Sequence, residues 1–101
     1  MSTLHIAWVR MTQGMIRDGL AANFIKDVVS SENLTGGAVS ASSGAMPSQA
    51  MEAICHSVDA NMYITSGAAP TAAVGTGVYL KSGEKAYFTP TAGHKIAVIN
   101  A

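Results

Sequence analysis

Three histidines, His5, His56 and His94, are the side chains of this sequence best suited to acid–base or metal chemistry, and two carboxylates, Glu52 and Asp59, flank His56. The histidines could meet in the folded chain. A metal motif, however, places its ligands at short fixed offsets on one element, whereas these residues are scattered singly. The spacing therefore predicts no metal site.

Nucleophilic and nucleotide-binding motifs have similarly little support. The serines lie in no Gly-x-Ser-x-Gly elbow, so a Ser/His/Asp hydrolase is not indicated. Gly75-Thr76-Gly77 lacks the third glycine and the following helix of a dinucleotide fingerprint, and we interpret it as a turn between strands. We predict a non-enzymatic protein with no catalytic, cofactor-binding or metal-ligating residues and no cofactor.

Cys55 is the only cysteine, which excludes an internal disulfide and a cysteine-based metal site. It lies in the strand-like run of residues 53–58. We interpret it as a small buried hydrophobic side chain.

Composition indicates a protein that works in an assembly. The 101 residues predict one domain, 1–101, with a thin core. Only 12% of residues are charged and 49% are hydrophobic, so the surface must be rich in Ser, Thr, Gly and Ala. Such a surface loses little ion hydration and rotamer entropy when another surface covers it, which favours a permanently assembled component.

The charge pattern excludes further classes. The formal net charge is zero and the six basic residues are spread along the chain, so no positive stripe for nucleic acid exists. The start of the sequence has no basic region and its longest apolar run is four residues, which predicts neither a signal peptide nor a membrane span. We expect synthesis in a cytosol.

Residues 53–101 show the two-residue period of β-strands, and we expect four or five strands there. Turn-forming residues at 66–70, 81–84 and 89–93 separate the runs. The pattern predicts an all-β fold, a single antiparallel β-sandwich or jelly-roll-like domain. Its expected buried face consists of Met62, Ile64, Leu80, Phe88, Ile96 and Val98.

The first half is less regular. Residues 4–11 predict a strand with Leu4, Ile6 and Trp8 on one face, and residues 24–30 predict another. Asp18-Gly19 between them favours a hairpin, because both residues tolerate positive φ. A short helix over 14–23 is the competing interpretation, but Gly19 in its interior would cost up to about 1 kcal/mol.

Residues 31–50 carry few large apolar side chains and predict a long, flexible Ser/Gly/Ala-rich loop or arm. We expect this segment to be the adaptable contact of the protein, ordering along a neighbouring subunit. In the isolated subunit it should be nicked rapidly by proteases.

The C-terminal segment resembles small structural proteins of tailed bacteriophages, of the head decoration or cement type. In those proteins a strand ends in a Gly-x-x-Pro-Thr-Ala turn, an apolar strand and a Gly-containing turn follow, and a last strand closes the chain. The runs that carry the resemblance are residues 60–72, 78–84, 87–88 and 93–99. The resemblance implies a β-sandwich virion component without catalytic residues.

From this resemblance and the low charge we expect a capsid decoration protein that binds the outer shell as an oligomer, with a trimer favoured. Its expected partners are copies of itself and the phage major capsid protein, with no nucleic acid and no membrane, and its expected location is the virion surface. A tail, neck or fibre-base component is the alternative within this class. A carbohydrate-binding module is the alternative from another class, and it would need exposed aromatic side chains on a flat face or cleft.

Overall fold

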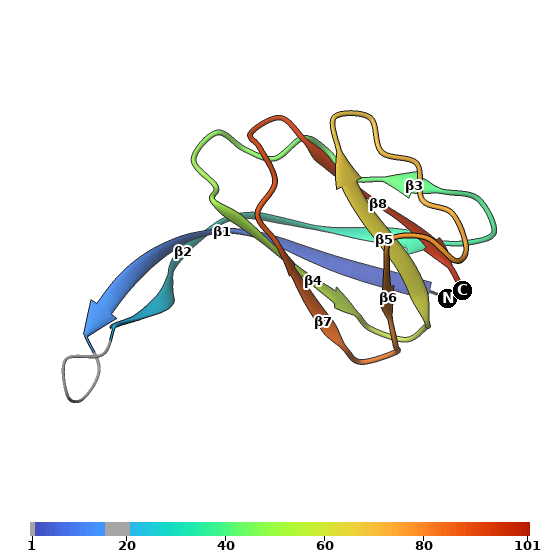
Figure 1. Cartoon of the computed structure of the whole chain (residues 1–101), viewed down its shortest axis with the longest axis horizontal. Coiled ribbons are helices and arrows are strands. Elements are labelled where there is room, and N and C mark those ends of the chain that lie inside the picture. The colour runs from blue at the N-terminus through green and yellow to red at the C-terminus, as the bar shows by residue number, and fades with distance from the viewer. Residues whose placement is uncertain (1, 16–20) are drawn as a thin grey trace.

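The computed structural model of this chain describes the backbone of residues 2–15 and 21–101, and the side chains of these residues apart from 12–15, 21–24 and 26. The described ranges contain eight strands and no helix (Figure 1). The strands are β1 (Ser2–Met15), β2 (Ala21–Gly36), β3 (Ala41–Ser42), β4 (Glu52–Ser57), β5 (Met62–Gly67), β6 (Val78–Leu80), β7 (Lys85–Phe88) and β8 (Lys95–Asn100). Over the same ranges, no helix is long and apolar enough to cross a membrane.

The strands form two antiparallel sheets of four strands each. The first has the order β2-β1-β4-β7 and the second β3-β8-β5-β6. The predicted all-β class is therefore confirmed, and the arrangement is compatible with a β-sandwich. Four or five strands are expected within residues 53–101, and five are present, as β4 to β8.

One hydrophobic core joins the two sheets, because side chains from both contribute to a single buried cluster. The first sheet supplies Leu4, Ile6 and Trp8, as the period of β1 predicts. The second sheet supplies the predicted residues Met62, Ile64, Leu80, Ile96 and Val98. Phe88 is a correction: it belongs to β7 of the first sheet and packs half-buried against this cluster rather than within one face with the others.

The last strand, β8, is covered on both faces. This differs from the expected pattern, in which buried and exposed residues alternate along the strand. Ile96 and Val98 face the main core, while Ala97 and Ile99 are buried in a second, smaller cluster with Ala72. The long connection from β5 to β6 brings Ala72 there, and its amide donates a hydrogen bond to Ser40 Oγ (2.9 Å). This connection shields the outer surface of β8 from solvent.

The first half of the chain forms a hairpin that is longer than expected. The two predicted strands, 4–11 and 24–30, lie within β1 and β2, which pair antiparallel with Met15 opposite Ala21. This pairing confirms the predicted hairpin. At residues 14–15 and 21–23, which the structure describes, it excludes the alternative helix over 14–23. The Asp18-Gly19 turn lies outside the described residues.

The expected loop of residues 31–50 is wrong in its boundaries. Residues 31–36 continue β2, because they pair with residues 2–7 of β1. Along this stretch the half-buried Glu32 and Leu34 alternate with exposed Ser, Asn and Thr residues. Further on, β3 pairs with β8. A strand with polar outward residues has a weak hydrophobic signal, which explains the miss.

The rest of this segment, residues 37–50, is attached to the body rather than forming a free arm. The Ser43 amide donates to the Ile96 carbonyl (2.7 Å), and the Ile96 amide donates to Ser43 Oγ (2.9 Å). The Met46 amide donates to the His94 carbonyl (2.8 Å), and Met46 and Ala50 are buried in the main core.

The projecting part of the molecule is the far end of the β1–β2 hairpin. β4 pairs with β1 only as far as Val9 opposite Glu52, and beyond that point β1 and β2 continue as a two-stranded ribbon (Figure 1). The pairing shifts register at Trp8/Val9 and again at Arg10/Met11, where the ribbon leaves the sheet. At about 3.3 Å per residue, residues 10–15 extend roughly 20 Å. The molecule is accordingly elongated, with extents of 47 × 26 × 21 Å.

Candidate functional site

The outer face of the first sheet is an open surface. It consists of two cross-strand rows, Asn33–His5–His56–Lys85 and Ser31–Ala7–Ile54–Tyr87, each running from β2 through β1 and β4 to β7. The four residues on the central strands are half-buried and the four on the edge strands are exposed. No described segment covers these rows.

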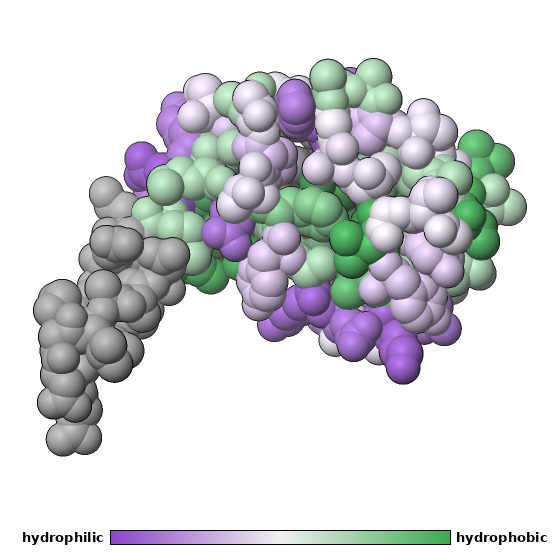
Figure 2. Space-filling model, in the orientation of Figure 1, coloured by the Kyte–Doolittle hydropathy of each residue, from purple (hydrophilic) through white to green (hydrophobic). Residues whose placement is uncertain are grey.

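This face is weakly charged. With neutral histidines, Lys85 is the one charged residue in the two rows, and Tyr87 is its most prominent apolar group, 62% exposed. In the view of Figure 2, pale residues of intermediate hydropathy cover much of the molecule, and strongly hydrophilic residues gather at its lower edge and upper left. Covering a weakly charged surface costs little desolvation free energy, because few charged side chains lose their hydration.

Two of the three histidines meet on this face. His5 and His56 are directly opposite each other in the β1–β4 pairing. His5 Nδ1 lies 2.7 Å from Asn33 Oδ1 on β2, and Lys85 on β7 is opposite His56. His94 lies apart, in the connection before β8, where its amide donates to the Thr91 carbonyl (2.9 Å).

Within the described residues, neither of the carboxylates that flank His56 in the sequence is bonded to a histidine of this pair. Asp59 Oδ1 accepts a hydrogen bond from the Thr3 amide (2.7 Å), and Glu52 is opposite Val9 at the end of β4. In the described part of the chain, no three His, Cys, Asp or Glu side chains gather into a group that could hold a metal ion.

Cys55 is fully buried on the core side of β4, as expected for a small hydrophobic side chain. Burial raises the pKa of its thiol to about 12. Because the thiolate is the reactive form, this thiol is a poor nucleophile at neutral pH.

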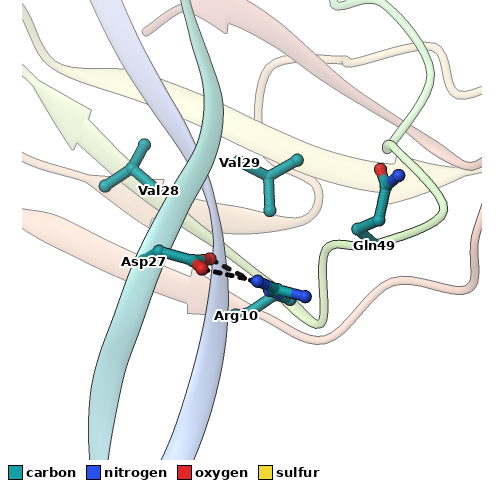
Figure 3. Close-up of a pocket in the computed structure, with 5 residues that line it drawn as sticks. All are labelled: Arg10, Asp27, Val28, Val29 and Gln49. Atoms are coloured by element: carbon teal, nitrogen blue, oxygen red, sulfur yellow. Dashed lines mark hydrogen bonds and ion pairs between the residues drawn. The ribbon is translucent and has the colours of Figure 1, made fainter.

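A shallow hollow of about 460 Å³ lies where the ribbon leaves the body, between β1, β2 and the segment before β4 (Figure 3). Arg10 Nε and Nη2 donate to Asp27 Oδ1 and Oδ2, at 3.0 and 2.6 Å. This bidentate pair raises the pKa of Arg10 above its ordinary value. Val28, Val29 and Gln49 complete the lining. The ion pair cross-links the two strands of the ribbon at its base, which gives the hollow a structural explanation.

Gly75-Thr76-Gly77 forms a turn between β5 and β6, as the sequence predicts. Both glycines have positive φ, and the Thr76 amide donates to the Ala73 carbonyl (3.2 Å). No helix follows the turn, so it lacks the context of a dinucleotide site.

The exposed aromatic side chains do not share a face. Tyr87 belongs to the first sheet, whereas Tyr79 belongs to the second, where its ring lies 5.2 Å from that of Tyr63 at an angle of 52°. Among the described side chains, no flat aromatic platform of the kind used by carbohydrate-binding modules is formed.

Comparison of the chain with protein-family models, with curated proteins and with solved structures finds no match.

Proposed function

We propose that this protein is a non-enzymatic structural component of a tailed-phage virion, a decoration or cement protein that binds the outer capsid shell as an oligomer. Its domain is a jelly-roll-like sandwich in this proposal. The observation that carries it is the open outer face of the first sheet, which is weakly charged, half-buried along its two central strands and exposed along its two edge strands. The resemblance of residues 60–72, 78–84, 87–88 and 93–99 to phage structural proteins supports the class of particle.

The outer face is the surface proposed to lie against the shell. Tyr87 on the edge strand β7 and Ile54 opposite it on β4 provide its main apolar contacts. Aromatic side chains of this exposure are typical anchors of protein interfaces. Because the β1–β2 ribbon continues from the same sheet, it can extend along the shell or over a neighbouring subunit.

Sheet edges support the oligomer. Among the described strands, β2 pairs with β1 alone, and its stretch of residues 30–36 holds neither Lys nor Pro, the residues that commonly protect an edge. Because directions alternate across the four strands, β2 and β7 run antiparallel to each other. β7 of one copy can therefore continue the sheet beside β2 of the next. Head-to-tail contacts of this kind form a closed ring when the rotation between copies closes, and a trimeric ring is the form we favour.

Binding to purified phage heads that lack the protein tests the proposal. Tyr87→Asp should reduce occupancy on the heads at least tenfold, because an unpaired carboxylate within the interface must be desolvated. Val74→Asp is the matched control: Val74 is also 62% exposed but lies in the connection between β5 and β6. Equal binding by the two variants would contradict the assignment of the face.

Particle fractionation separates the remaining possibilities. Recovery of the protein in the head fraction supports its role in decoration. Recovery only with tails or necks would contradict binding to the capsid shell and assign the protein to the tail or neck. Sedimentation of the free protein should show a trimer at high micromolar concentration. A monomer at this concentration, together with the absence of a trimer on the particle, would contradict the proposed oligomer.

A further inference from the structure

The pair formed by His5 and His56 on the outer face suggests a function that the sequence spacing does not predict. The two residues are distant in the sequence but directly opposite in the β1–β4 pairing, and both side chains are half-buried on the same side of the sheet. Side chains in this relation have Cβ atoms about 4.5–5.5 Å apart. Their imidazole rings are neighbours without any movement of the backbone.

The hydrogen bond from His5 to β2 fixes the role of its ring nitrogens. Asn33 Oδ1 can only accept, so His5 Nδ1, 2.7 Å away, carries the proton. In the neutral ring Nε2 then holds the free lone pair, and it is directed away from Asn33 because the two nitrogens point to different sides of the ring. Metal-binding histidines are typically held in this way, with one nitrogen donating to an oxygen and the other left for the metal.

We propose that His5 Nε2 and a ring nitrogen of His56 together bind a divalent transition metal ion of the zinc class. Zinc–nitrogen bonds of about 2.0–2.1 Å place two ligating nitrogens of a tetrahedral site roughly 3.3 Å apart, a spacing that neighbouring cross-strand imidazoles can reach. Imidazole nitrogen suits Zn²⁺, Ni²⁺ and Cu²⁺ rather than Ca²⁺ or Mg²⁺.

The surroundings leave the site open. Lys85, opposite His56, is exposed, and its long side chain can hold the ammonium group in solvent away from the metal. Since the described residues provide no third ligand, two positions of a tetrahedral ion are left for water or for a donor group of a molecule that covers the face. The site is independent of the proposed virion function, because it requires only the histidine pair.

Titration of the metal-free, ¹⁵N-labelled full chain with ZnCl₂ tests this inference. We expect the imidazole nitrogen signals of His5 and His56 to shift together and to saturate at one equivalent, while those of His94 stay unchanged. His5→Gln and His56→Gln should each weaken binding at least tenfold, and His94→Gln should leave it unaltered. A response of one histidine alone, or an equal response of all three, would overturn the proposal.

Asn33 offers a graded control that a merely structural role would not reproduce. Asn33→Ala should weaken Zn²⁺ binding about 10-fold or more by releasing the His5 ring. Asn33→Asp should strengthen it, because a carboxylate makes the bound imidazole a better donor. Identical affinities for the three proteins would refute the orientation of His5, and amide spectra recorded without metal verify that each variant is folded.

Discussion

Replacing Gly77 by alanine should destabilise the protein far more than the same replacement at Gly75, although both glycines have nearly the same backbone conformation. Gly77 has φ +83° and Gly75 has φ +87°. A side chain in this left-handed region costs about 1–2 kcal/mol at either position. The surroundings differ: a Cβ at Gly75 meets nothing within 4 Å, whereas a Cβ at Gly77 would lie 2.5 Å from the carbonyl oxygen of Ile64.

Moving the Ile64 carbonyl oxygen away from this contact would cost free energy. Ile64 is in the centre of β5, paired with Val78 on β6 and with Val98 on β8, and its side chain is fully buried. Relief of the overlap must shift either β5 or the entry into β6. Overpacking of this kind typically costs about 1–3 kcal/mol. We therefore expect a loss of about 2–5 kcal/mol for Gly77→Ala and about 1–2 kcal/mol for Gly75→Ala.

Urea denaturation followed by tryptophan fluorescence measures both losses, because Trp8 is buried in the core. The two losses differ by the overpacking cost of about 1–3 kcal/mol. With a slope of about 1–1.5 kcal/mol per molar urea for a domain of this size, the midpoints of the two variants should differ by about 0.7–3 M. Free energies of unfolding within about 0.5 kcal/mol of each other would refute the reasoning. Such values would show that the β5–β6 connection shifts to accommodate the alanine side chain without a loss of stability.

Two further predictions concern the core. Ile64→Asp or Val98→Asp should prevent folding, since an unpaired buried carboxylate costs several kcal/mol of a total of about 5–15, while Lys85→Asp on the exposed edge should be mild; equal urea midpoints would refute the assigned faces. Burial raises the pKa of Cys55 from 9.0 to about 12, so its contribution to stability is complete below pH 9.0 and is lost as the pH rises towards 12. The stability of the wild type relative to Cys55→Ala should therefore fall across this window, and a difference that does not change with pH would contradict the buried thiol.

The strands that the sequence predicts best are those in which fully buried residues alternate with residues that are only partly covered or exposed. In β5, Met62 and Ile64 alternate with Tyr63 and Thr65, and the structure buries the first two completely. In β8 the same reasoning finds Ile96 and Val98 but misses Ile99, because the cover over the outer surface of that strand comes from a distant connection. Periodicity reports the pleat of a strand and not what lies above it.

The histidine pair shows a second limit. Nothing local brings His5 beside His56: their contact depends on which strands are neighbours and on the register of their pairing. A shift by one residue would place one histidine on the opposite face. The register is held by the inward side chains Leu4, Ile6 and Cys55, which are visible in the sequence only as separate apolar positions.

The two ends of the described chain lie side by side, at the end of the molecule opposite the ribbon (Figure 1). Asn100 Nδ2 donates to Ser2 Oγ at 2.9 Å, so a short linker can join them without distortion. A circular permutant, opened at the exposed residues 73–76 of the connection between β5 and β6 and closed through this linker, should keep both sheets. A fluorescent protein attached at either end would likewise leave the ribbon unobstructed, so one tagged chain can report on binding by the far side of the molecule.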